Sequence, residues 1–172
     1  PQDYILQSWE MDDEFKVLDI QKVWEAFVES DRFSRLSLLA DADSFNRLSS
    51  QYPVYLITNL PGFLFEKRQK NLELHQLLYN GIYFAGHFNF GEADYPSKSK
   101  MIKKLHKKGE RIVFLDDHPK NCLDVKTSFP ESDVFLMSRP HNKELENPGW
   151  IRVNDWKDFV SKVSSFSISD TD

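Results

Sequence analysis

Short apolar segments alternate with amphipathic, helix-like segments along most of the chain. The apolar segments, rich in residues that favour strands, are residues 53–58, 81–85, 111–115, 133–137 and 150–153. The segments typical of helices are residues 63–79, residues 97–108, a stretch that opens at Pro119, and residues 155–163. Strands that alternate with helices predict a parallel sheet covered by helices on both faces, which is an α/β fold.

The first 50 residues are polar and helical in pattern. An apolar stripe at helical spacing predicts one amphipathic helix, formed by Ile20, Val23, Trp24, Phe27 and Val28. A second helix is predicted over residues 44–51, with Asp43 as its N-cap. The expected organisation is a small helical, cap-like segment over residues 1–50, an α/β core over residues 51–163, and a frayed, Ser- and Asp-rich tail over residues 164–172.

Two of the predicted strands end in polar residues that can carry chemistry. One ends at Thr58 and Asn59, and another is followed directly by Asp116 and Asp117. Ligands of parallel α/β sheets bind beyond the carboxyl ends of the strands. Two carboxylates about 4 Å apart repel each other by a few kcal/mol at an effective dielectric of about 20, and a hard cation such as Mg²⁺ relieves that repulsion. The alternative is that Asp117 or His118 only caps the next helix.

Lys98 is a further candidate. It lies in the first turn of a helix that Ser97 can cap, where a cation opposes the helix dipole unless an anion such as phosphate lies in front of it. The alternative is that Lys98 is solvated like the other lysines of this helix, among which Lys100 is the second choice. Thr58 taken alone is more typical of a turn. The chain order of Thr, Lys and the acid pair excludes a receiver domain, in which the acid pair comes first.

This order and the residues around it resemble the haloacid dehalogenase superfamily, and in particular its 5'(3')-deoxyribonucleotidase branch. The resemblance is carried by FAGHFNFGEADYPSKSKMIKKL at 84–105, IVFLDDHPKNCLDV at 112–125, RPHN at 139–142 and RVNDW at 152–156. KVWEAFVESDRFSRL at 22–36 is similar to the small helical cap of the family. The resemblance covers most of the chain and implies a Rossmann-like fold with a Mg²⁺-dependent phosphohydrolase activity.

The resemblance implies a role for each residue at the strand ends. Thr58 would bind the transferring phosphoryl group, with Asn59 beside it. Lys98 would neutralise charge on that group, so Thr58 and Lys98 would be the catalytic residues in this chain. Asp116 and Asp117 would hold Mg²⁺ directly or through water.

The resemblance also implies a substrate side and a supporting metal residue. Asn121 would not bind the metal itself but would adjust the site by contacting a metal ligand. The loop at residues 86–91, with His87 and Asn89, would line the substrate side. The implied substrate is a small phosphorylated metabolite or a nucleotide.

The superfamily also needs a strand that ends in Asp-x-Asp, whose first Asp attacks phosphorus and whose second acts as general acid and base. Three segments could be considered for this strand, and none fits. Asp41 and Asp43 lie too close to the next predicted strand to leave room for a cap, and Asp19 is not followed by a second acid two residues later. A strand at residues 4–6 would not be followed directly by an aspartate. Two explanations stay open. Either a strand with both aspartates precedes Pro1 in the intact protein, which we favour, or the domain is an inactive one that binds phosphate or a partner without turnover.

Composition narrows the range of partners. With 172 residues the chain suits one domain, and its net charge of -5 disfavours binding a nucleic acid polymer through a broad basic face. A nucleic-acid end phosphatase, suggested by the lysine-rich helix, is the weakest alternative for the same reason. No apolar run reaches the roughly 20 residues of a membrane span, and the single cysteine, Cys122, fits a reducing compartment. We therefore expect a cytoplasmic protein that binds a small phosphorylated ligand.

Overall fold

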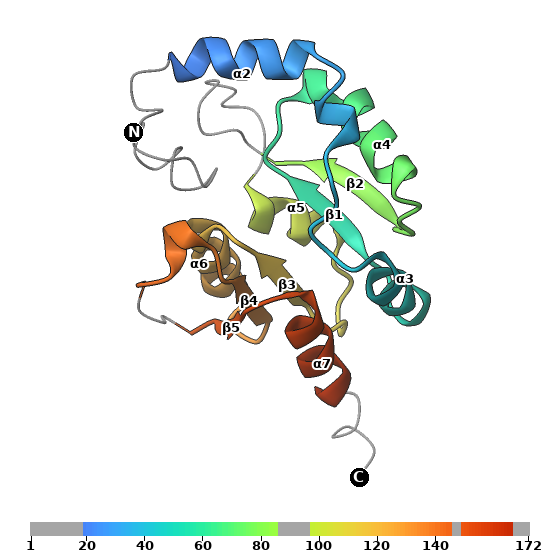
Figure 1. The fold of residues 1–172 in the computed structure, drawn as a ribbon. Helices are drawn as coiled ribbons and strands as arrows, with labels where there is room; N and C mark the ends of the chain where they lie inside the picture. The colour runs from blue at the N-terminus through green and yellow to red at the C-terminus, as the bar shows by residue number, and fades with distance from the viewer. Residues whose placement is uncertain (1–18, 86–96, 146–148, 167–172) are drawn as a thin grey trace.

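The structure, a computed structural model, describes residues 19–85, 97–145 and 149–166 (Figure 1). In these ranges helices and strands alternate as the sequence predicts. In chain order the elements are α2 (Ile20–Glu29), η2 (Phe33–Arg35), α3 (Ala42–Gln51), β1 (Tyr55–Thr58), η3 (Gly62–Leu64), α4 (Phe65–Leu74), β2 (Gly81–Phe84), α5 (Lys98–Leu105), β3 (Val113–Asp116), α6 (Pro119–Ser128), β4 (Asp133–Met137), η4 (Pro140–Asn142), β5 (Ile151–Val153) and α7 (Trp156–Phe166).

Every strand pair of the described residues is parallel. β1 pairs with β2, and Thr58 lies beside Phe84 at the carboxyl end of that pair. β4 lies between β3 and β5, with Asp116 beside Leu136. The strands form two sheets, because within the described ranges β1 and β3 do not pair with each other. The predicted α/β class, with parallel strands flanked by helices, is confirmed.

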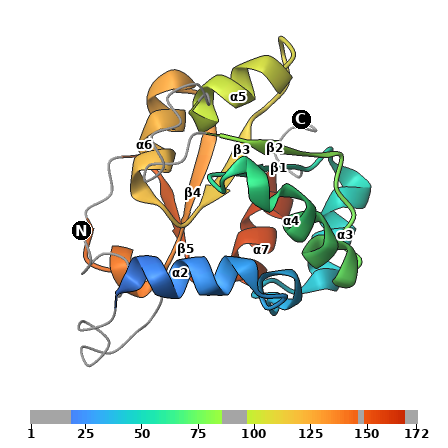
Figure 2. The same ribbon diagram turned by 90° about the horizontal axis from the view of Figure 1, so that it is seen from above.

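The side chains of β4 alternate between two hydrophobic cores. Val134 and Leu136 belong to a buried cluster with α5 and α6, whereas Phe135 and Met137 belong to a cluster with α3 and α7. Figure 2 shows the same layers, with α5 and α6 on one side of β4 and α7 on the other. A strand buried on both faces is typical of the interior of a parallel sheet. The layers therefore follow from the continuous apolar run of β4.

The helices that precede β1 pack in two different places. α2 and η2 lie against η3 and α4, where Val28, Phe33 and Leu64 form a buried cluster. α3 packs on α7 instead, and there the ring of Phe45 stacks on that of Trp156. The division of the chain into a cap-like segment and a core at residue 50 stays a prediction.

Two aspartates cap the helices that precede β1. Asp19 caps α2 by accepting a hydrogen bond from the backbone N–H of Lys22 (3.3 Å). The prediction that Asp43 caps the second helix is wrong. Asp41 is the N-cap, because its carboxylate accepts from the backbone N–H of Ser44 (3.2 Å), and Asp43 already lies in the first turn of α3.

Other predicted elements are present with shifted ends. α4 ends at Leu74 rather than at residue 79, and Gln76 beyond it has a φ of 52°, a left-handed conformation that a right-handed helix does not contain. β3 begins at Val113 and includes Asp116, so this carboxylate belongs to the strand itself. Over the described ranges, no helix is both long and apolar enough to span a membrane. The cytoplasmic location stays a prediction.

Candidate functional site

Lys98 and Asp116 form a buried ion pair at the carboxyl end of β3. Asp116 is the last residue of β3 and Lys98 is the first residue of α5. Lys98 Nζ lies 2.6 Å from Asp116 Oδ2, and the two side chains are only 10% and 5% exposed. Ion pairs this deeply buried need further hydrogen bonds to offset the loss of hydration. Two residues that the sequence analysis assigned to the same site are therefore in direct contact.

Two more groups donate to the Asp116 carboxylate. The backbone N–H of His118 donates to Oδ1 (2.8 Å). The side-chain amide of Asn121 lies within hydrogen-bonding distance of both carboxylate oxygens, with Nδ2 at 3.3 Å from Oδ1 and 3.2 Å from Oδ2. Asn121 lies in the first turn of α6, so the turn after β3 brings it back to the strand end. Lys98, His118 and Asn121 together hold the carboxylate in one orientation.

Asn121 also joins the end of β1 to this site. Its Nδ2 donates to Asn59 Oδ1 (3.1 Å), and Asn59 Nδ2 donates to the carbonyl oxygen of Ala85, just after β2 (3.3 Å). The hydroxyl oxygen of Thr58 accepts from the backbone N–H of Leu60 (3.3 Å), a turn contact that does not use the hydroxyl proton. The carboxyl ends of the two sheets therefore meet at the Asn121 amide.

The N-terminal end of α5 is fixed by side chains. Ser97 caps the helix, as predicted, by accepting from the backbone N–H of Lys100 (3.4 Å). Asp124 of α6 accepts from the backbone N–H and from the hydroxyl of Ser99 (3.1 and 2.9 Å). Asp124 is not among the residues predicted from the sequence, although it follows Asn121 by three residues and therefore shares its helical face. These contacts fix the helix end that carries the ammonium group.

Asp117 differs from Asp116 because its side chain is exposed. Its backbone carbonyl oxygen lies 2.8 Å from Asn142 Nδ2 and 3.1 Å from His141 Nε2. His118 caps α6 with its Nδ1, so the capping alternative holds for His118 and leaves both carboxylates to the site. Burial lowers the pKa of His118, against the opposing effect of the neighbouring Asp116 and Asp117 charges.

The groups at the strand ends fit an open Mg²⁺ site. Mg²⁺ in proteins usually takes one or two carboxylates and keeps several waters or phosphate oxygens. Asp116 and Asp117 offer such oxygens on adjacent residues, one buried and one exposed. Over the part of the chain that the structure describes, no group of three or more His, Cys, Asp and Glu side chains could hold a metal ion by itself. The predicted substrate residues His87 and Asn89 lie outside the described residues.

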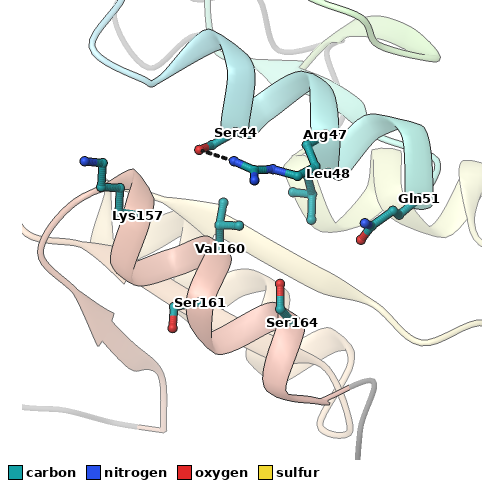
Figure 3. A pocket seen from close by; sticks show the side chains of 8 residues that line it. All are labelled: Ser44, Arg47, Leu48, Gln51, Lys157, Val160, Ser161 and Ser164. Carbon is teal, nitrogen blue, oxygen red and sulfur yellow. Dashed lines mark hydrogen bonds between the residues drawn. The ribbon is translucent and has the colours of Figure 1, made fainter.

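A separate groove of about 370 Å³ lies between α3 and α7 (Figure 3). It is lined by the facing sides of the two helices, from Ser44 to Gln51 and from Lys157 to Ser164. Its cations, Arg47 and Lys157, are exposed, and Arg47 donates to the Ser44 hydroxyl (3.2 Å). The groove shares no residue with the Asp116 site and brings no buried charge to a strand end. It is therefore not the candidate site.

Comparison with known proteins identifies the fold. No family model and no curated protein matches the chain in sequence. Among solved structures, the chain is similar to the D,D-heptose 1,7-bisphosphate phosphatase from B. bronchiseptica complexed with magnesium and phosphate, with a TM-score of 0.57 and 10% identity over 76% of this chain and 85% of that chain. The chain has a Rossmann-like fold of the haloacid dehalogenase type. At this identity the likeness concerns the fold alone, and the deoxyribonucleotidase branch stays a prediction.

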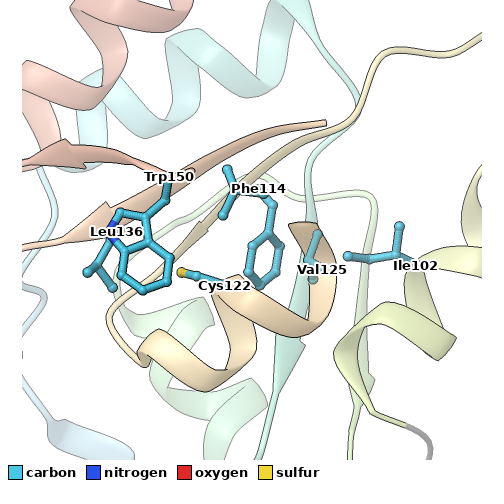
Figure 4. Packing of buried hydrophobic residues seen from close by; sticks show 7 residues of the cluster. Ile102, Phe114, Cys122, Val125, Leu136 and Trp150 are labelled. Atoms are coloured by element: carbon cyan, nitrogen blue, oxygen red, sulfur yellow. The ribbon is translucent and has the colours of Figure 1, made fainter. Parts of the chain in front are cut away.

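Cys122 lies directly behind the site, in the buried cluster of α5, α6 and β4 (Figure 4). Its thiol Sγ lies 3.8 Å from the carbonyl oxygen of Asp116 and 3.5 Å from that of Phe135. Burial, together with the nearby Asp116 charge, raises the pKa of the thiol from its ordinary 9.0 to about 12. The folded chain therefore keeps this thiol protonated at neutral pH.

We expect Cys122 to lower the free energy of unfolding at alkaline pH. Because the folded thiol has the higher pKa, the unfolded thiol ionises first, and stability falls as pH rises from 9.0 towards about 12. Cys122→Ala should therefore flatten the loss of unfolding free energy over this range, measured by urea denaturation at a series of pH values. The small cavity left by the substitution shifts both ends of the series equally. Parallel pH profiles for the two proteins would contradict the expectation.

Proposed function

We propose that this chain is a Mg²⁺-dependent phosphohydrolase domain of the haloacid dehalogenase type that binds a small, nucleotide-like phosphomonoester at the carboxyl ends of β1 and β3. The observation that carries the proposal is the buried Lys98–Asp116 pair, which Asn121 connects to the end of β1. An ammonium, a carboxylate and a hydroxyl at the carboxyl ends of neighbouring strands are groups used to bind a phosphoryl group with a divalent cation. The magnesium and phosphate bound to the similar phosphatase add support.

Each group of the proposed site would have a distinct task. Lys98 would neutralise negative charge on the phosphoryl oxygens, and the hydroxyl of Thr58 would donate a proton to one of them. Asp116 and Asp117 would hold Mg²⁺, which would stabilise charge on the same oxygens as a Lewis acid. Asn121 would keep the Asp116 carboxylate in its orientation.

The substrate side of the proposed site begins at the carboxyl end of β1. Asn59 lies at the junction of the two sheets, with its amide between Asn121 and the Ala85 carbonyl. It would orient the ligand next to Thr58. His87 and Asn89 remain proposed substrate contacts on the strength of the sequence resemblance. A nucleotide is the substrate class that this resemblance favours.

A phosphate-binding domain without turnover is the second candidate. The observation that favours it is that Asp19 and Asp41 both serve as helix N-caps. A capping carboxylate is bonded to backbone N–H groups of its own helix, and it is therefore not directed at the strand ends. This observation concerns the described residues, and residues 1–18 lie outside them.

Hydrolysis and binding assays distinguish the two candidates. In a form of the protein that also carries the strand with the two aspartates, we expect hydrolysis of p-nitrophenyl phosphate or of a nucleoside monophosphate in the presence of Mg²⁺. The rate should fall about hundredfold or more in Asp116→Asn, since a preorganised charge at the reacting group is removed. Asp133→Asn is the matched control. Asp133 pairs with Arg111 (2.7 Å) at the opposite end of β4 and should leave the rate unchanged.

Calorimetric titration with inorganic phosphate and Mg²⁺ covers the remaining outcomes. Binding that is lost in Asp116→Asn, without any hydrolysis, would support the second candidate. Hydrolysis that Asp116→Asn leaves intact would contradict the assigned site. A chain that neither binds phosphate with Mg²⁺ nor hydrolyses an ester would contradict both candidates.

A further inference from the structure

Two segments that carry the sequence resemblance, RPHN at 139–142 and RVNDW at 152–156, meet at one buried side chain. Arg152 of the second segment contacts the side-chain amide of Asn142 in the first. Asn142 is 0% exposed. Its Nδ2 donates to the carbonyl oxygens of Asp117 and Met137, each at 2.8 Å. Its Oδ1 accepts from the backbone N–H of Arg139 (3.0 Å) and from Arg152 Nη1 (3.1 Å). Both donors and both acceptor positions of the amide are therefore used.

The contact between Asn142 and Asp117 leads directly to the Asp116 carboxylate. The C=O of Asp117 and the N–H of His118 belong to one planar peptide unit. Asn142 donates to the carbonyl side of this unit (2.8 Å), and the N–H side donates to Asp116 Oδ1 (2.8 Å). A hydrogen bond to the carbonyl also polarises the peptide and strengthens its N–H as a donor. A single rigid group thus connects Asn142 to the site.

Arg152 fixes Asn142 from the far strand of the sheet. Arg152 lies on β5, and in addition to the contact with Oδ1 its Nη2 donates to the carbonyl oxygens of Asn142 (3.1 Å) and Leu145 (3.2 Å). Two nitrogens of one planar guanidinium hold a partner in a defined orientation better than a single ammonium does. β5 therefore contributes directly to the position of the Asn142 amide.

We propose that Asn142 is a positioning residue for Asp116, acting through the peptide that joins Asp117 to His118. The consequence for ligand binding rests on the proposed function, whereas the positioning itself does not. Among the described residues, the hydrogen bonds of the Asn142 side chain do not include one to the Asp116 carboxylate, so it acts through the peptide alone. Its effect is to keep the His118 N–H pointed at Asp116 Oδ1 and thereby to fix which carboxylate oxygens face the site.

Asn71 provides a matched control elsewhere in the fold. It is 4% exposed, its Nδ2 donates to the carbonyl oxygens of Ser34 (3.4 Å) and Leu36 (2.8 Å), and its Oδ1 accepts from Arg68 (3.0 Å). This is the same pattern of two carbonyls and one guanidinium, between η2 and α4. Asn71→Asp and Asn142→Asp therefore make the same chemical change, and only the second is connected to Asp116.

The test is the hydrogen exchange of the His118 amide, measured by NMR in the wild-type chain and in both variants under conditions where all are folded. Relative to global unfolding, we expect exchange of this amide to become about tenfold faster in Asn142→Asp, the effect of losing one buried hydrogen bond, and to stay unchanged in Asn71→Asp. A general loss of stability would accelerate exchange equally in both variants. Equal acceleration, or none in Asn142→Asp, would overturn the proposal.

A second variant and a Mg²⁺ titration complete the exchange experiment. If Asn142→Asp does not fold, Arg152→Lys retains the amide but loses the two-nitrogen contact, and it should still accelerate His118 exchange more than Asn71→Asp does. A Mg²⁺ titration of the same samples tests the consequence for the site, with affinity expected to fall severalfold in Asn142→Asp alone. A wild-type chain that binds no Mg²⁺ would contradict the proposed function, while the exchange result would still decide the positioning.

Discussion

Replacing Lys98 by Met is expected to lower the free energy of unfolding by about 3–5 kcal/mol. The substitution keeps most of the side-chain volume but removes the ammonium group that lies 2.6 Å from Asp116 Oδ2. The carboxylate would stay buried, and its remaining hydrogen bonds from Asn121 and the His118 N–H carry no full positive charge. The loss of stability therefore measures an uncompensated buried charge, and urea denaturation followed by tryptophan fluorescence would detect it.

A second substitution separates charge from packing. Adding Asp116→Asn to Lys98→Met removes both charges, so the double variant should recover much of the stability that Lys98→Met loses. Lys162→Met is the matched control, because Lys162 pairs with Asp158 on the surface of α7, where the two side chains are 41% and 26% exposed. Pairs of that kind contribute at most about 1 kcal/mol. Equal losses in Lys98→Met and Lys162→Met would show that burial does not strengthen the Lys98–Asp116 pair.

The fold class and the residues Lys98 and Asp116 could be predicted from the sequence because both predictions depend on local patterns. Continuous apolar runs and helical stripes define the layers, and the rule that parallel strands present their carboxyl ends to ligands pointed to Thr58 and Asp116. A place in the first turn of a helix favours Lys98 over Lys100 as the candidate, and in the structure Lys98 is buried while Lys100 is exposed. The position at the start of the helix therefore distinguishes the buried lysine from its exposed neighbour, and the role of Lys98 stays a prediction.

Other features could not be predicted, because they depend on distances between segments that are remote in sequence. The Asn142 amide reaches a carbonyl oxygen 25 residues earlier, and Asp124 reaches Ser99 over the same separation. Neither contact leaves a periodic pattern. The prediction of the N-cap of α3 was wrong for a different reason. Asp41 and Asp43 are equally good capping residues two positions apart, so propensity alone does not choose between them.

Replacing Phe135 by Ala is expected to destabilise the chain by about 3–5 kcal/mol, the usual cost of removing a fully buried aromatic ring. Phe135 is 0% exposed and lies on β4, the strand that has neighbours on both sides. Its ring packs edge-on against Phe159 of α7, with centroids 5.1 Å apart, and lies 6.1 Å from the ring of Phe166. Deleting it would leave a cavity between the sheet and α7 that neither rigid element can close.

Phe63→Ala is the control for this prediction, since the Phe63 side chain is 64% exposed and should cost less than about 1 kcal/mol when removed. The measurement is the midpoint of urea denaturation at an unchanged slope, which reports stability rather than a change in the unfolded chain. A loss in Phe135→Ala as small as that in Phe63→Ala would mean that the contact between β4 and α7 does not hold the core together. α7 would then be a loosely attached helix, and the sheet would draw its stability from the α5 and α6 side.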